Sequence, residues 1–144
     1  MTQRVPRWWK QPLAGDIVWC YFPDELQTEP AEKPRPALIL TVFDDRAPEY
    51  GVLVAYGTSQ RVTELYAGEF AITRADGEAF RAAGLSYDTK FNLARRVQLL
   101  FNDEYFDVPP GAPHGQQPKL GVLHPALMRR AAAAHNATTS TERT

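Results

Sequence analysis

The sequence of 144 residues has a single cysteine and no long apolar run. One cysteine excludes a disulfide framework within the chain and is typical of a reducing compartment. Cys20 lies in a strand-like stretch, so we interpret it as a buried, inert thiol rather than a reactive one. Residues 1–10 are basic and aromatic, unlike the apolar region of a secretion signal. We therefore expect a cytoplasmic protein with no membrane partner.

The chain also lacks an excess of charge of either sign. Lys and Arg total 16 and Asp and Glu total 17, for a formal net charge of −1. Any contact with nucleic acid must then come from a local basic patch. There is no Cys/His cluster and no glycine-rich phosphate loop, so we expect no metal and no nucleotide cofactor. His114, His124 and His135 have no partner at catalytic spacing, and we interpret them as structural or surface residues.

One local patch combines aromatic and basic residues. Trp8 and Trp9 are flanked by Arg7 and Lys10. This pattern suits the stacking of nucleic-acid bases, but it equally suits packing of the N-terminal segment onto the domain or a partner subunit. We favour the packing interpretation. A second basic group, Lys90 with Arg95-Arg96, either extends a basic groove or is the outward face of a strand.

What the sequence does contain is a series of short segments rich in β-branched and aromatic residues, separated by turns. They predict strands at 16–22, 37–43, 51–57 and 69–73, with one or two more within 90–101. Two segments with four prolines each, 23–36 and 107–118, are predicted to be loops.

Helical signals are few. Asp76 is a predicted cap for a short helix over about 77–83, which ends at Gly84. Pro125 suits the first position of a C-terminal helix that runs to about Ala134. We expect one domain over residues 1–135 and a disordered, Thr- and Ser-rich tail over 136–144.

Short strands with one inserted and one terminal helix predict a mainly β, α+β fold of the small-barrel type. The strands should form one strongly bent antiparallel sheet that closes on itself. Their apolar and aromatic residues exceed what one small barrel can bury, so we also expect a symmetric dimer.

The segment Lys33-Pro34-Arg35-Pro36 precedes one predicted strand, and Thr58-Ser59-Gln60 ends the next. Pro34 has a fixed φ and Pro36 biases Arg35 towards an extended backbone. Antiparallel pairing would bring the two strand ends together. A planar guanidinium forks onto phosphate oxygens, and small hydroxyl donors position the reacting groups. The pattern therefore favours a phosphodiester site.

Four segments occur in the order Gly15–Trp19, Arg35–Leu40, Val54–Gln60 and Leu120–Leu123, with a helix after the last. In this order and spacing, the chain over roughly 13–134 resembles the PemK/MazF family of toxin–antitoxin endoribonucleases. The resemblance implies an SH3-like barrel, a homodimer, metal-independent cleavage of single-stranded RNA, and inhibition by a cognate antitoxin.

In that family, the arginine of the Arg-Pro motif and a threonine at the end of the third strand carry catalysis. The resemblance assigns these roles to Arg35 and Thr58. Ser59, Gln60 and Lys33 are candidates for substrate binding, and Glu29 and Glu32 for a carboxylate near the arginine, although a solvated loop is the simpler interpretation of both glutamates. The loop before Arg35 has more proline and less glycine than is usual in the family.

A different class of function stays open from the sequence. A catalytically silent barrel of the same fold, which binds a protein or nucleic-acid partner, would have the same strand pattern. Cleavage of a long single-stranded RNA in the presence of a chelator separates the two.

Overall fold

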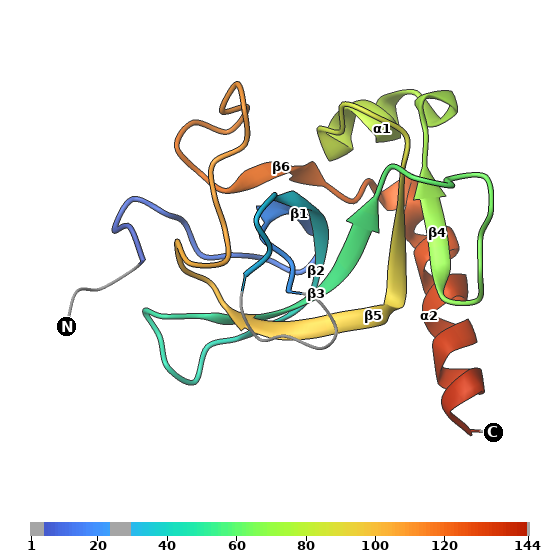
Figure 1. The fold of residues 1–144 in the computed structure, drawn as a ribbon, viewed down its shortest axis with the longest axis horizontal. Helices are drawn as coiled ribbons and strands as arrows, with labels where there is room; N and C mark the ends of the chain where they lie inside the picture. Colours follow the sequence, from blue (N-terminus) through green and yellow to red (C-terminus); the bar gives the residue numbers. More distant parts are fainter. Residues whose placement is uncertain (1–4, 24–29, 144) are drawn as a thin grey trace.

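The computed structural model describes residues 5–23 and 30–143. Six strands carry the fold (Figure 1): β1 (Asp16–Cys20), β2 (Arg35–Phe43), β3 (Gly51–Thr58), β4 (Glu69–Ile72), β5 (Thr89–Leu100) and β6 (Lys119–Val122). The helical elements are η1 (Arg74–Asp76), α1 (Glu78–Ala83), η2 (Pro125–Leu127) and α2 (Met128–Arg143).

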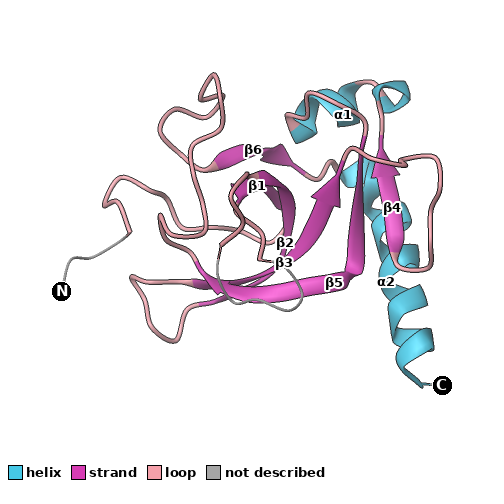
Figure 2. Cartoon of the chain, in the orientation of Figure 1, coloured by secondary structure: helices cyan, strands magenta, loops and turns pink. Residues whose placement is uncertain are grey.

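The strands form one antiparallel sheet in the order β4-β5-β3-β2-β1-β6. The sheet curls into a half-barrel, and α1 lies between its two edge strands (Figure 2). α2 packs along β4 and β5. The predicted fold class, mainly β with short helices, is confirmed. The two edges of the curled sheet, β4 and β6, are not paired with each other, so closure is by the helix rather than by a ladder.

Alternation along the strands divides the buried side chains into two clusters. Leu38 and Ala55 belong to a cluster that α1 and α2 cover, whereas Ala37, Ile39 and Val54 belong to a cluster with aromatic residues of the segment after β5. The sheet is therefore buried on both faces over much of its length. This explains why the sequence has continuous apolar runs rather than strict alternation.

Glycine permits the close approach of α1 to β6. A Cβ atom at Gly121 would clash with the backbone of Ala83, and one at Gly84 would clash with the Leu120 carbonyl. Gly84 also has the left-handed backbone (φ 69°) that ends α1, as predicted.

The C-terminal helix is longer than the sequence indicated. It continues through Arg143, so residues 136–143, which we expected to be a disordered tail, are helical in the structure. The reason is packing: Thr138 is buried against the glycine backbone at Gly68, and its hydroxyl donates to the His135 carbonyl at 2.7 Å. The Thr-rich composition of this segment did not indicate that Thr138 is buried.

Asp76 holds α2 to the sheet instead of capping α1. Its carboxylate accepts the Thr73 backbone N–H at 2.8 Å and two guanidinium N–H groups of Arg130 at 3.0 Å each. Arg130 also donates to the Ala71 carbonyl at 2.9 Å. The hydrogen bonds from Arg130 hold the pKa of Asp76 below its usual value, and the bond from Thr73 lowers it further.

We predict that Arg130→Gln lowers the free energy of unfolding at pH 7 by no more than about 1 kcal/mol, because Arg130 is partly exposed. Since the folded-state pKa of Asp76 is depressed, this stabilisation is present above pH about 4 and is lost as the pH falls through the lowered pKa. Denaturant titrations from pH 7 to 2 should show the two chains converging below pH about 4. Arg129→Gln, at an exposed position of the same helix, is the control. A constant difference at all pH values would contradict the assignment.

Candidate active site at the ends of β2 and β3

The sheet register brings the two predicted site residues opposite each other. Ala37 pairs with Tyr56 across β2 and β3, and the same register continued by two residues puts Arg35 opposite Thr58. Opposite residues of an antiparallel pair project from the same face. Arg35 and Thr58 therefore share the face of Tyr56, at the ends of the two strands.

Arg35 is the first residue of β2 and is exposed. It pairs with Cys20 of β1, so its backbone is held between two strands. Its guanidinium makes no hydrogen bond or ion pair with any residue in the described parts of the chain. The proline on each side keeps the backbone extended, and the guanidinium is available to an anion.

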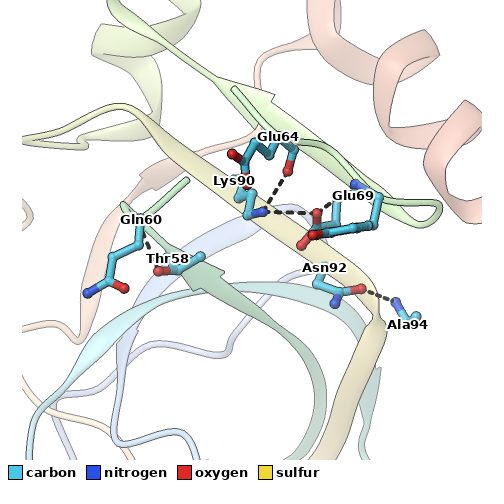
Figure 3. Close-up of polar contacts among 8 residues, drawn as sticks. Thr58, Gln60, Glu64, Glu69, Lys90, Asn92 and Ala94 are labelled. Atoms are coloured by element: carbon cyan, nitrogen blue, oxygen red, sulfur yellow. Dashed lines mark hydrogen bonds and ion pairs between the residues drawn. The ribbon is translucent and has the colours of Figure 1, made fainter. Parts of the chain in front are cut away.

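Thr58 ends β3 and is half-buried. Its hydroxyl oxygen accepts the backbone N–H of Gln60 at 3.2 Å (Figure 3). This turn uses one lone pair of the hydroxyl and leaves its proton available to donate to a ligand.

Lys90 lies opposite Thr58 on the other side, in β5. Its ammonium donates to the Glu64 carbonyl at 2.8 Å and to the Glu69 carboxylate at 3.0 Å, and it lies 5.4 Å from the centre of the Tyr66 ring (Figure 3). Both side chains of the ion pair are more than nine-tenths buried. Lys90 is therefore part of neither a basic groove nor an outward face. Through its bond to the Glu64 carbonyl, Lys90 holds the segment that connects β3 and β4 against β5.

A second guanidinium, that of Arg95, lies on the face of Thr58, and sequence reasoning did not single it out as a site residue. The β3–β5 ladder jumps from Tyr56–Asn92 to Ala55–Arg96, so residues 93–95 bulge out of register. In this bulge the Arg95 guanidinium lies 4.1 Å from the centre of the Tyr56 ring and 5.7 Å from that of Phe22. Arg95 belongs to the second basic group described in the sequence analysis. Nothing in the sequence indicates the bulge that orients its side chain.

The remaining predicted site residues are dispersed. Ser59 and Gln60 are exposed just beyond β3, and Lys33 is exposed before β2. Glu32 is exposed near Lys33, and Glu29 lies outside the described residues. Neither Lys33 nor Glu32 makes a hydrogen bond or ion pair with a residue that the structure describes.

A cavity of about 460 Å³ adjoins the same strand ends. Arg35, Pro36 and Ser59 line one side of it, but Thr58 is not among the lining residues. Ser59 lies in the bend just beyond β3, and its side chain lines the cavity whereas that of Thr58 does not. Arg35 therefore adjoins two surfaces. One is the face of the sheet that carries Thr58, and the other is the cavity that Ser59 also lines.

The aromatic pair near the N-terminus packs in part on the domain. The Trp9 ring lies 5.4 Å from that of Phe101, whereas Trp8 is 59% exposed. Gln117 links the N-terminal segment to the rest of the domain, because its side chain donates to the Trp8 carbonyl and accepts from the Lys10 N–H. The packing interpretation therefore holds for Trp9.

His124 caps η2 by accepting the Ala126 N–H at its Nδ1. His114 and His135 are exposed. Burial raises the pKa of the Cys20 thiol far above its usual range, so this thiol is not a nucleophile at neutral pH.

Within the described ranges, no three His, Cys, Asp or Glu side chains are grouped in a way that could hold a metal ion. None of the helices that the structure describes is both long and apolar enough to span a membrane.

Comparison with solved structures relates this geometry to a known protein. One solved structure that matches is an endoribonuclease in complex with its cognate antitoxin from a Mycobacterial species, with a TM-score of 0.55 and 18% sequence identity. The alignment covers 90% of this chain and 95% of the other. This chain shares its fold with an endoribonuclease. The finding agrees with the PemK/MazF resemblance seen in the sequence. No family model and no curated protein matches the chain.

The meeting of the two strand ends depends on Gly57. A Cβ atom there would clash with the Pro36 carbonyl oxygen and come within 2.8 Å of the Phe91 ring. Gly51, in the same strand, has ordinary space, with its nearest neighbour 3.6 Å from a built Cβ.

We predict that Gly57→Ala destabilises the fold by about 1–3 kcal/mol, as overpacking of a filled site does, and that Gly51→Ala costs much less. Denaturant unfolding of both variants tests this. Equal effects of the two substitutions would show that β2 and β3 are not held this close at their ends.

Proposed function

We propose that this chain is a metal-independent endoribonuclease that cleaves single-stranded RNA, with Arg35 and Thr58 as its catalytic residues. The observation that carries the proposal is the placement of an exposed guanidinium and a hydroxyl opposite each other, on one face, at the ends of β2 and β3. The fold shared with an endoribonuclease supports it.

RNA supplies its own nucleophile for this reaction, the 2′-hydroxyl next to the scissile phosphate. Attack on phosphorus forms a 2′,3′-cyclic phosphate and expels the 5′-oxygen of the following nucleotide. The 2′-hydroxyl gives its proton to water, and the departing 5′-oxygen takes a proton from water. The protein must then stabilise the charge of the pentavalent transition state. Fixed donors aimed at such charge are usually the largest single contribution to catalysis.

Arg35 fits that part, because a guanidinium donates two parallel N–H bonds to phosphate oxygens. Thr58 donates its hydroxyl proton to a second oxygen, since the Gln60 N–H already fixes the orientation of the hydroxyl. Neither group is a good proton carrier: arginine stays protonated above pH 12 and a threonine hydroxyl is a weak acid. We therefore expect slow turnover.

Arg95 adds positive charge beside this pair. Its guanidinium is stacked on Tyr56, two residues before Thr58 on the same face. We assign it to holding the RNA backbone near the scissile phosphate. Ser59, Gln60 and Lys33, all exposed around the strand ends, are the proposed contacts to the neighbouring nucleotides.

A cognate antitoxin is the proposed protein partner, by analogy with the complex formed by the structural neighbour. We also propose a symmetric homodimer. An apolar groove of about 440 Å³ runs between α2 and the strands β2 and β3, with Leu53 and Met128 in its lining. Met128, which is 54% exposed, lies beside other apolar residues of this groove, and connected apolar surfaces rather than single exposed side chains are typical of interfaces.

We predict that the purified chain cleaves a long single-stranded RNA with chelator present and leaves 2′,3′-cyclic phosphate ends. Arg35→Ala and Thr58→Ala should each lower the rate on the order of 100-fold or more. Arg35→Lys should lose less than Arg35→Ala, because lysine keeps the charge and loses only the two-pronged geometry.

Lys33→Ala is the matched control, a lysine two residues from Arg35 that should change binding of RNA more than the rate of the chemical step. Circular dichroism establishes that each variant is folded. Alanine variants that cut as fast as the parent would overturn the catalytic assignment. A folded parent that binds RNA or protein without cutting would support the silent barrel instead.

For association, we predict a mass of twice 16.2 kDa by light scattering at micromolar concentration. Met128→Glu puts a charge in the apolar groove and should shift the population to monomer, whereas Arg129→Glu, at the next position of the helix, should not. A parent chain that stays monomeric would contradict the dimer.

A further inference from the structure

The cavity beside Arg35 is not used by the reaction described above. Resting on the proposed function, we propose that it holds a nucleobase of the RNA, that of a nucleotide flanking the phosphate bound by Arg35, and that Tyr87 is the stacking residue that sets which base is accepted. The pocket lies between the strand ends, the segment from α1 to β5, and the loop that contains Pro110 and Pro113.

Size is the first argument. At about 460 Å³ the cavity lies in the range of small-ligand sites, and it is large enough for one base with part of its ribose. The exposed Arg35 is one of its lining residues, so a nucleotide whose phosphate binds the guanidinium can place its base inside. The loop of residues 107–118 thereby gains a role as one wall of the pocket.

The lining is the second argument. Trp19, Leu85 and Leu120 give an apolar interior, and Ser59, Ser86 and Tyr87 add hydroxyls. Among the lining residues that the structure describes there is no Asp, Glu or Lys, and Arg35 is the one charged group. A neutral, planar ring with hydrogen-bonding edges matches this chemistry, because bases of single-stranded RNA are held by stacking and by bonds to their edges. An ammonium ligand would find no counter-charge among these residues, and the proposed reaction already uses the one guanidinium to bind the phosphate.

The third argument is that the protein fixes the turn that presents Tyr87. Arg74 donates to the Ser86 carbonyl at 2.9 Å, and its backbone N–H donates to Asp88 at 2.8 Å. The buried Thr89 hydroxyl donates to the Tyr87 carbonyl at 2.8 Å. The Tyr87 side chain itself is 67% exposed and has no hydrogen-bond partner among the described residues. A rigid backbone thus holds an exposed ring at the mouth of a cavity, which is the arrangement a stacking platform needs.

The first test does not depend on catalysis. The four nucleoside 5′-monophosphates are titrated separately into the ¹⁵N-labelled chain, with ribose 5-phosphate as the base-free control. We expect the amides of Leu85 to Tyr87 and of Gly111 to shift with at least one nucleotide and not with ribose 5-phosphate. If ribose 5-phosphate shifts the same amides as strongly, the cavity binds a sugar phosphate and the proposal is overturned. It is also overturned if no nucleotide shifts them.

The second test uses variants. Tyr87→Ala should weaken nucleotide binding roughly ten-fold, as loss of one stacking ring does, and Tyr87→Phe should bind as the parent does. Tyr66→Ala removes an equally exposed tyrosine that does not line the cavity, and should have no effect on nucleotide binding. Equal effects of Tyr87→Ala and Tyr66→Ala would contradict the assignment.

Cleavage separates this inference from the proposed function. On RNA substrates that differ in one base beside the cut, Tyr87→Ala should lower the preference between bases and raise KM more than it lowers kcat. If Arg35→Ala abolishes cleavage while Tyr87→Ala leaves rate and base preference unchanged, the endoribonuclease stands and the base pocket is wrong. If no variant or parent cuts RNA but nucleotides still shift the cavity amides, the pocket stands and the catalytic proposal is wrong.

Discussion

The structure depends on how closely β2 and β3 approach at their ends. There a glycine faces the Pro36 carbonyl and the Phe91 ring, and no other residue type fits the space. The β2–β3 ladder extends to Ala37 and Tyr56, and its register, continued by two residues, puts Arg35 opposite Thr58. Because the two strands approach so closely, position 57 cannot accept a side chain unless β2 or Phe91 moves. Because protein interiors are close-packed, a shift of the backbone at this position would also displace the residues in contact with it.

The end of β3 and the bend that follows it contribute to two different surfaces. Thr58 projects to the side of Tyr56 and Arg95, and Ser59 projects to the cavity. Arg35 reaches both. A substrate that occupies both surfaces would be held at its phosphate and at a base by residues that are adjacent in sequence. Under the proposed function, the reaction and the choice of base would depend on the same strand end.

The sequence predicted the fold class and five of the strands, because β-branched runs between turns are strong local signals. It also placed Arg35 and Thr58 at neighbouring strand ends. It did not predict β6, where Gly121 interrupts the apolar pattern of a four-residue strand, nor the length of α2, where the buried Thr138 lies in a Thr-rich stretch. The bulge that turns Arg95 onto Tyr56 and the burial of Lys90 also had no local signal. Both arise from partners distant in sequence, and a single sequence does not reveal those.

The buried pair Lys90–Glu69 has a consequence for how this protein can vary. Removing one member leaves a charge buried without a partner, which typically costs about 3–5 kcal/mol, whereas replacing both by apolar residues of similar size can be neutral. Lys90 also holds the Glu64 carbonyl, and so the segment that follows the Thr58 turn. Positions 69 and 90 can therefore change only together. Among homologues, we therefore expect positions 69 and 90 to covary. We also expect the connection between β3 and β4 to keep its length where its sequence varies.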